Sequence, residues 1–253
     1  AVSRGWCYGS RKAFPRIENI GYQGYINFSQ FMNSHPCKYE YKAKILPTKL
    51  AVISKFFIKN KREFFSKIKV ILAPALNLKV NNKKIKKNNK NIITLVLTGI
   101  KEIDQKIISW SLKFVQENMS IKLIIKFHPI LGPESFDKQL INNFNNQVKI
   151  SKQDIESLLD SSNIIVSTGP TSAIFQALLK KCYLMIPVFD PWDKLNLVNC
   201  KIPKENYVLA FNYQDFRFKL KNMIKNRNKK KLKIIKNKYI FNTINLKNMK
   251  IFQ

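Results

Sequence analysis

Two groups of polar residues in the second half of the chain have the chemistry to hold an anion. His128 ends an apolar run and precedes Pro129, where its ring can donate a hydrogen bond to a phosphate or protonate a leaving group. Residues 167–172 read Ser-Thr-Gly-Pro-Thr-Ser, and their glycine permits a sharp turn. The hydroxyls and first N–H groups of a following helix can bind phosphate oxygens. Together the two groups predict a phosphate site.

Each group also has an ordinary structural explanation. A lone histidine is more often structural than functional, and Ser or Thr commonly caps a helix. The case for a site depends on where both groups lie, because each follows a strand-like run. The elements around these runs must therefore position both groups.

The chain after residue 91 alternates strand-like and helix-like patterns. We expect strands at 92–98, 121–127, 148–151, 163–167, 183–188 and 207–211, with helices at 103–118, 136–144, 154–161 and 171–181. Alternation with short connections predicts an α/β, Rossmann-like parallel sheet with helices on both faces. Such sheets bind ligands at the carboxyl ends of strands, near the point where strand order reverses. Four segments meet this condition: Thr98-Gly99, His128-Pro129, residues 167–172 and Phe189-Asp190.

The organisation of the chain is predicted in four parts. Residues 80–91 are a polar Lys/Asn linker, and residues 1–79 before it have short apolar runs typical of a partial α/β lobe. Residues 92–212 are the Rossmann-like lobe, and residues 213–253 are Lys-rich helices. Since the chain begins without Met or a signal pattern, we expect a fragment that lacks part of its first lobe.

Charge is the most unusual property of the composition. The formal net charge is +31, but only six of the 46 basic residues are Arg, the residue that clamps phosphates and reads bases. The abundance of Lys, Asn and Ile is also typical of AT-rich coding sequence. Nucleic-acid binding is therefore disfavoured, although a basic face can associate peripherally with an anionic membrane.

Membrane spans and metal sites are not indicated. The apolar runs are shorter than the roughly 20 residues that cross a bilayer. The four cysteines have no CxxC spacing, and with two histidines they predict no metal site. They read as reduced thiols of a cytoplasmic protein.

Three segments carry a resemblance to a known family. They are Lys126 to Pro129, the run Asp-Ile-Glu-Ser-Leu-Leu at 154–159, and residues 163–178. These resemble the C-terminal lobe of GT-B glycosyltransferases of bacterial surface carbohydrate synthesis (capsule, lipopolysaccharide, O-antigen). The related groups include sialyl-, polysialyl- and Kdo transferases and CDP-glycerol glycerophosphotransferases. Residues 21–24 and 45–52 look like the end of the first lobe of such proteins.

The resemblance implies a GT-B-like fold and transfer of a sugar from a CMP- or other nucleotide-activated donor to a glycan or lipid-linked acceptor. It gives His128, Thr171 and Ser172 contacts to the donor phosphate, needs no cofactor or metal, and places Tyr22 and Gln23 in an interlobe loop. The predicted phosphate and nucleotide site comprises Thr98, Gly99, His128, Ser167, Thr168, Gly169, Thr171 and Ser172.

The catalytic base is harder to assign. His128 and Asp190 are the catalytic candidates, although a turn role for Asp190 before Pro191 is equally reasonable, and Glu18 and Glu40 are further candidates. Gly169 and Pro170 depart from many relatives, and no Glu follows the motif in the arrangement of retaining enzymes. The stereochemistry is therefore open.

Two alternatives remain. A sugar-nucleotide epimerase of the UDP-N-acetylglucosamine 2-epimerase type shares the two-lobed fold, but it would normally show several carboxylates and histidines at the crevice. A non-catalytic basic protein that binds nucleic acid is the other. We expect a cytoplasmic protein, with the inner membrane face as its site of peripheral association.

Overall fold

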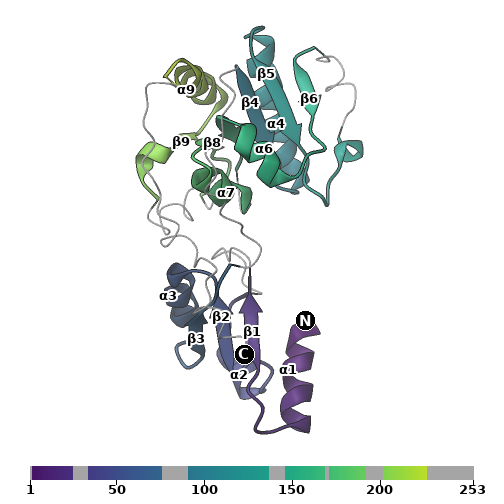
Figure 1. The fold of residues 1–253 in the computed structure, drawn as a ribbon, viewed down its shortest axis with the longest axis vertical. Coiled ribbons are helices and arrows are strands. Elements are labelled where there is room, and N and C mark those ends of the chain that lie inside the picture. The colour runs from purple at the N-terminus through teal and green to yellow at the C-terminus, as the bar shows by residue number, and fades with distance from the viewer. Residues whose placement is uncertain are drawn as a thin grey trace. The chain divides into compact units, whose positions relative to one another are not determined.

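The structure is a computed structural model that describes residues 2–24, 34–75, 91–136, 146–168, 171–191 and 202–226. Contacts divide the chain into two compact units, and the described residues up to Ala75 belong to the first and those from Asn91 to the second (Figure 1). None of the described helices is long and apolar enough to cross a membrane.

The second unit contains a six-stranded sheet in which every pair of neighbouring strands is parallel. Its strands are β4 (Ile92–Val96), β5 (Lys122–Lys126), β6 (Val148–Ile150), β7 (Ile164–Val166), β8 (Tyr183–Pro187) and β9 (Tyr207–Ala210). The spatial order is β6-β5-β4-β7-β8-β9, which is the Rossmann order. Strand order therefore reverses at β4, where Leu95 pairs with Ile125 on one side and Val166 on the other.

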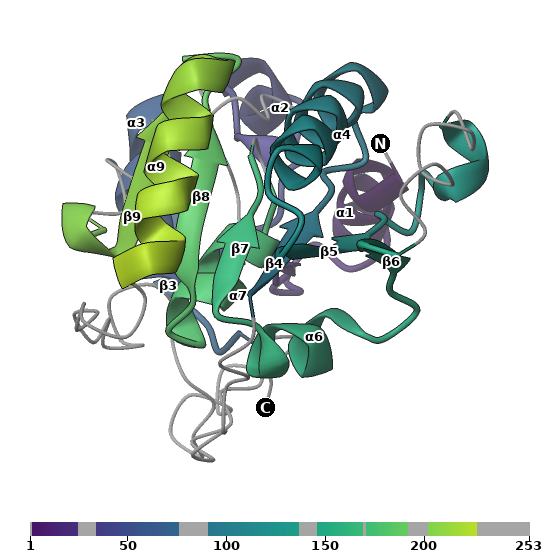
Figure 2. The same cartoon turned by 90° about the horizontal axis from the view of Figure 1, so that it is seen from above.

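Helices cover both faces of this sheet, as the α/β prediction requires (Figure 2). They are α4 (Lys101–Gln116), α6 (Ile155–Ser161), α7 (Ala173–Leu179) and α9 (Tyr213–Asn226), with short 3-10 turns η2 (Pro133–Ser135) and η3 (Lys204–Asn206). Helices α4 and α9 contact each other, as do α6 and α7. The main core lies beneath α4 and α9, where Ile107, Phe114 and Phe216 are fully buried. Burial of this apolar surface is the main stabilising contribution.

The first unit has a smaller parallel sheet in the order β1-β2-β3. Its strands are β1 (Ile20–Gln23), β2 (Lys49–Val52) and β3 (Lys69–Leu72), and its helices are α1 (Val2–Ala13), α2 (Lys38–Lys42) and α3 (Lys55–Phe64). Ala51, Val52 and Ile53 are completely buried, because β2 is the central strand. Two of the apolar runs expected as strands, 50–53 and 69–72, coincide closely with β2 and β3. The run expected at 17–20 is not a strand apart from its last residue, and β1 instead covers residues expected in a loop. The three helices of this unit were not anticipated.

Some expected elements differ in extent. Helix α7 begins at Ala173, two residues after the expected start, because the Thr171 Oγ1 accepts a hydrogen bond from the Ala173 N–H ahead of the helix. Most of the helix expected at 136–144 lies outside the described residues, although Phe136 packs on Phe127 with ring centroids 5.4 Å apart. The linker expected at 80–91 and the chain beyond residue 226 also lie outside them, apart from Asn91.

Candidate functional site

The residues expected at strand ends follow the carboxyl ends of four strands of the second unit. Thr98 and Gly99 follow β4, His128 follows β5, Ser167 and Thr168 follow β7, and Asp190 follows β8. Because all these strands are parallel, their carboxyl ends lie at one edge of the sheet. Strands β4 and β7 flank the reversal in strand order, which is where Rossmann-like sheets bind ligands.

Gly99 and His128 are in direct contact. The Gly99 backbone has φ of +84°, and a Cβ added there would lie 2.6 Å from the His128 Nδ1. The imidazole therefore rests against a glycine surface that no other residue can supply without strain. The His128 Nδ1 accepts a hydrogen bond of 3.2 Å from the Ile130 N–H. In the neutral ring the proton is then on Nε2, which is a hydrogen-bond donor suited to a phosphate oxygen.

The hydrogen-bond donors of Thr98 and Gly99 point toward a carboxylate inside the protein. The Asp104 carboxylate on α4 accepts hydrogen bonds from the Thr98 N–H at 2.7 Å, the Thr98 hydroxyl at 2.9 Å and the Gly99 N–H at 2.8 Å. These groups were expected to contact phosphate. In this structure they contact a carboxylate of the protein, and their direct role at phosphate stays a prediction.

Asp104 is the site residue that sequence reasoning missed. It is completely buried, and this burial raises the pKa of its carboxyl, whereas the hydrogen bonds from Thr98 and Gly99 and the charge of His128 act to lower it. An acidic residue in the first turn of a helix normally reads as an exposed partner of the helix dipole. The signal that could have found it is its position in an otherwise apolar stripe with Ile107 and Ile108.

Ser167 and Thr168 use their hydroxyls to join strands. The Ser167 hydroxyl donates to the Val96 carbonyl at 2.8 Å, and the Thr168 hydroxyl donates to the Pro187 carbonyl. Both residues are completely buried. They tie the end of β7 to β4 and β8, so the phosphate contacts predicted for them need these hydrogen bonds to be replaced.

Thr171 and Ser172 lie between β7 and α7 with different environments. Thr171 is 9% exposed, and its Oγ1 accepts a hydrogen bond of 3.3 Å from the Ala173 N–H, which leaves its own hydroxyl proton for another acceptor. Ser172 is exposed, and its side chain makes no capping hydrogen bond to α7. Gly169 of the same predicted motif lies outside the described residues.

The catalytic candidates other than His128 are scattered. Asp190 is exposed after Phe189, whose ring packs on Trp110 with centroids 4.9 Å apart. Glu18 and Glu40 belong to the first unit, where they form 2.5 Å ion pairs with Lys49 and Arg4. Among the residues that the structure describes, no three His, Cys, Asp or Glu side chains are grouped as metal ligands would be.

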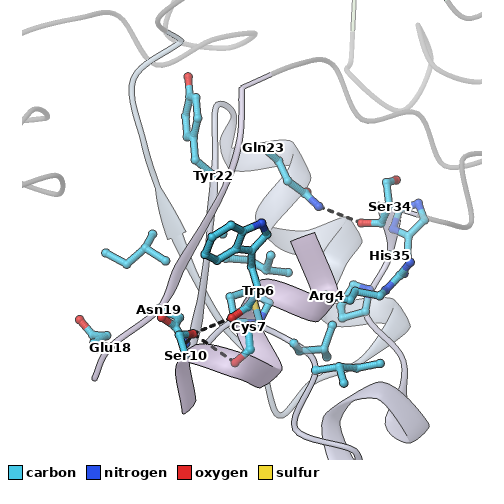
Figure 3. Close-up of a pocket in the computed structure, with 17 residues that line it drawn as sticks. Arg4, Trp6, Cys7, Ser10, Glu18, Asn19, Tyr22, Gln23, Ser34 and His35 are labelled. Atoms are coloured by element: carbon cyan, nitrogen blue, oxygen red, sulfur yellow. Dashed lines mark hydrogen bonds between the residues drawn. The ribbon is translucent and has the colours of Figure 1, made fainter. Parts of the chain in front are cut away.

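Tyr22 and Gln23 line a cavity of about 800 Å³ within the first unit (Figure 3). The Tyr22 hydroxyl donates to the Pro74 carbonyl at 2.8 Å, and the Gln23 amide donates to the Ser34 carbonyl at 3.0 Å. These contacts hold the end of β1 to other parts of the same unit. The loop predicted for Tyr22 and Gln23 is wrong, because both residues belong to β1 and pair with Ala51 and Val52 of β2. A role for them between the two lobes stays a prediction.

Among the residues that line this cavity is a buried histidine, His35, which contacts a buried lysine, Lys61. His35 is 4% exposed and stacks on Phe64 with centroids 3.8 Å apart. The Lys61 ammonium is completely buried, donates to the Ser34 carbonyl at 2.6 Å and lies 3.2 Å from the His35 Nδ1. Burial lowers the pKa of Lys61 from 10.5 to about 7. Nothing in the sequence pattern distinguished this lysine from the many others.

Several solved structures have a fold similar to that of this chain. A mutant of S. aureus TarM in complex with Fondaparinux, alpha-GlcNAc-glycerol and UDP superposes with a TM-score of 0.56 at 14% identity, over 87% of this chain and 48% of that one. Arabidopsis thaliana UGT89C1 with UDP-L-rhamnose gives 0.56 at 10% identity, over 91% and 62%. The chain has a GT-B-like fold.

A third GT-B-like structure, S. aureus MnaA with UDP, gives a TM-score of 0.51 at 11% identity, over 88% of this chain and 69% of that one. The chain spans about half the length of TarM and less than two thirds of UGT89C1. No protein-family profile and no curated protein sequence matches the chain. The likeness therefore concerns the fold, and the activity must be argued from the residues.

Proposed function

We propose that the chain is part of a glycosyltransferase and that its second unit binds the nucleotide-activated sugar donor. The observation that carries this proposal is the position of His128, held against Gly99 beside the strand-order reversal with Nε2 as a donor. The fold adds support, because TarM, MnaA and UGT89C1 were each solved with UDP or a UDP-sugar.

The donor phosphate is the group that this site would hold. The His128 Nε2–H and the Thr171 and Ser172 hydroxyls would donate hydrogen bonds to its oxygens. As the bond to the sugar breaks, negative charge grows on the departing phosphate, so donors placed there in advance lower the barrier. A protonated His128 would also supply a proton to the leaving group.

The acceptor side of the reaction needs a general base. An acceptor hydroxyl attacks the sugar carbon and must lose its proton to a base, for which Asp190 at the end of β8 is the candidate on this unit. The proposed acceptor is a glycan or a lipid-linked saccharide of the bacterial surface. The chemistry proposed here requires no cofactor and no metal ion.

The proposal has two versions, in which the base of the donor nucleotide is either cytosine or uracil. The sequence resemblance to sialyl- and Kdo transferases and CDP-glycerol glycerophosphotransferases favours cytidine. The solved structures with the same fold hold UDP. Both versions use the same phosphate contacts, so a nucleotide panel distinguishes them.

We also propose that the protein acts at the cytoplasmic membrane face. A formal charge of +31 attracts anionic headgroups, with each Lys or Arg near the surface worth about 1 kcal/mol. Cosedimentation with phosphatidylglycerol vesicles, but not with phosphatidylcholine vesicles, is the expected result. Equal pelleting with both would contradict it.

The phosphate site is tested by thermal unfolding with CMP, CDP, UDP and GDP. We expect at least one nucleotide to raise the melting temperature of the wild-type chain, and His128→Ala to abolish the rise. His128→Gln retains an N–H donor near the position of Nε2 and should recover part of it. Asp154→Asn is a matched control, because Asp154 is an exposed cap of α6 that accepts from the Ser157 N–H.

Two outcomes would overturn the proposal. The first is a wild-type chain that none of the four nucleotides stabilises. The second is a His128→Ala chain with the same nucleotide response as the wild type. A salt-sensitive mobility shift with generic DNA or RNA, without any response to nucleotides, would instead support the nucleic-acid alternative.

A further inference from the structure

Among the described residues of the second unit, Asp104 is the one acidic or basic residue that is completely buried. Its side chain is completely buried, yet it receives three hydrogen bonds from only two residues, Thr98 and Gly99. A carboxylate is costly to bury unless hydrogen bonds compensate it, and N–H or O–H donors to a charged oxygen are strong ones. The three bonds therefore fix the turn after β4 firmly to α4.

This turn is the surface against which His128 rests. The Gly99 φ of +84° belongs to the left-handed region, and the Gly99 N–H is one of the three donors to Asp104. The virtual Cβ of Gly99 is 2.6 Å from the His128 Nδ1 and 2.8 Å from its Cγ. A change in how Asp104 holds Gly99 would thus move the backbone that the imidazole touches.

Helix capping does not account for this arrangement. The residue that caps α4 is Ile100, which makes no side-chain capping bond, and Asp104 lies inside the helix and reaches back to the preceding turn. Asp154 offers a comparison within the same unit. It is exposed and caps its own helix α6 through the Ser157 N–H at 2.9 Å. Asp104 instead connects α4 to a turn that contacts His128.

We propose that Asp104 is a positioning residue for His128, which acts by holding the Thr98-Gly99 turn in the conformation that supports the imidazole. The proposal rests on the proposed function in so far as His128 binds the donor phosphate. In this proposal Asp104 acts without contacting the nucleotide, because its side chain is completely buried. Electrostatics connects the two residues as well, because the charge of His128 acts to lower the pKa of Asp104 against the burial that raises it.

The first test is a double-mutant cycle on nucleotide affinity, with UDP as the probe and isothermal titration calorimetry as the measurement. Asp104→Asn keeps the shape of the side chain but replaces an acceptor oxygen with an N–H donor facing the turn. We expect it to weaken UDP binding by about tenfold in the wild-type background, as for the loss of about 1.4 kcal/mol. In the His128→Ala background we expect less than a twofold effect, because the residue through which it acts is gone.

A purely structural role for Asp104 gives a different pattern. Asp104→Asn would then lower UDP affinity equally in both backgrounds, or lower only the melting temperature, and either result would overturn the proposal. Asp154→Asn, the same substitution at the cap of α6, should leave affinity unchanged. If Asp104→Asn does not fold, Thr98→Val replaces it in the cycle, because it removes the hydroxyl that donates to Asp104 at 2.9 Å and leaves Gly99 and His128 unchanged.

The second test needs no nucleotide and keeps the inference separate from the proposed function. The chain has two histidines, so its imidazole ¹⁵N spectrum is simple, and His128→Ala identifies the signals of His128. We expect Asp104→Asn to shift the His128 signals and Asp154→Asn to leave them in place. Unchanged His128 signals in folded Asp104→Asn would overturn the positioning role, even if the wild type binds UDP. Shifted signals in a chain that binds no nucleotide would sustain the positioning role while the proposed function fails.

Discussion

At the residue scale, the contact between Gly99 and His128 is the feature on which the candidate site depends most directly. A positive φ of +84° and an imidazole within van der Waals contact both require a residue without a Cβ. This requirement is independent of the identity of the nucleotide. The requirement for glycine at position 99 can therefore be tested by measuring both the stability of the protein and its affinity for nucleotide.

Gly99→Ala should lower the free energy of unfolding by about 1–2 kcal/mol, the cost of left-handed backbone for a residue with a Cβ. It should also weaken nucleotide binding, because the new methyl group overlaps the His128 ring. Urea unfolding and calorimetric titration measure the two effects. Gly9→Ala is the matched control: it lies in α1, where an added Cβ meets nothing within 4 Å, and Ala should stabilise the helix by up to about 1 kcal/mol. Equal effects at the two glycines would contradict the argument.

At the scale of elements, the hydroxyls around β7 divide into those that join strands and those that face outward. Ser167 and Thr168 donate to carbonyls of β4 and β8, and both are completely buried. Ser172 is exposed and makes no capping bond. The two kinds should respond differently to removal of the hydroxyl.

Ser167→Ala should lower the free energy of unfolding by about 1–3 kcal/mol, because it leaves the Val96 carbonyl without that donor. Its effect on nucleotide affinity should be small. Ser172→Ala should do the reverse, with loss of affinity and little change in stability. Chemical unfolding and nucleotide titration of both variants check this. A selective loss of affinity in Ser167→Ala would restore the direct phosphate contact predicted for Ser167.

Lys61 on helix α3 should make the stability of the folded protein depend on pH. Burial lowers the pKa of Lys61 to about 7, whereas its value in the unfolded chain is near 10.5. Between these values the unfolded state binds the proton and the folded state does not, so the contribution of Lys61 makes stability rise with pH from about 7 to 10.5. At most this contribution is about 1.4 kcal/mol per pH unit.

Lys61→Met should remove that contribution, which is measured as the difference between variant and wild type in unfolding free energy across pH 7 to 10. Lys59→Met on the same helix is the control, because the Lys59 side chain is 81% exposed. It should leave the slope of the wild type unchanged. A parallel slope for Lys61→Met and the wild type would show that Lys61 keeps its proton in the folded state.

The elements were predictable from the sequence to the extent that their patterns are local. Runs such as 92–98 and 121–127 are rich in β-branched residues and confined between polar segments, so they predicted β4 and β5 and the α/β fold class. Helix α1 escaped prediction because Gly5 and Gly9 weaken its helical signal and its face is largely exposed. Asp104 and Lys61 escaped because their burial depends on distant partners, and charged residues usually lie at the surface.

Among the site residues, the sequence predicted positions better than contacts. His128, Ser167 and Asp190 were expected at strand ends and do follow them. The direction of a hydroxyl or N–H is set by neighbouring strands, as in the bond from Ser167 to Val96, and no local pattern encodes it. The chemical roles predicted for these residues stay predictions.

At the scale of the whole molecule, the division into two units gives a prediction about where nucleotide binding resides. The six-stranded sheet, Asp104, His128 and Ser172 all belong to the second unit. A fragment of residues 91–226 should therefore fold and retain the nucleotide preference of the whole chain. Circular dichroism and the thermal-shift panel measure this. A folded fragment without any nucleotide response would show that residues outside it contribute to the site.

The position of β4 between β5 and β7 has a consequence for synthesis of the chain on the ribosome. Of the six-stranded sheet, strands β4, β5 and β6 are synthesised first and can pair with one another. The other edge of β4 pairs with β7, with Ile93 opposite Ile164. At roughly 5–20 residues per second, that edge stays open for several seconds before its partner is made. An open strand edge is a template for aggregation. We therefore expect nascent chains that end before residue 164 to recruit chaperones more strongly than chains that extend past residue 187.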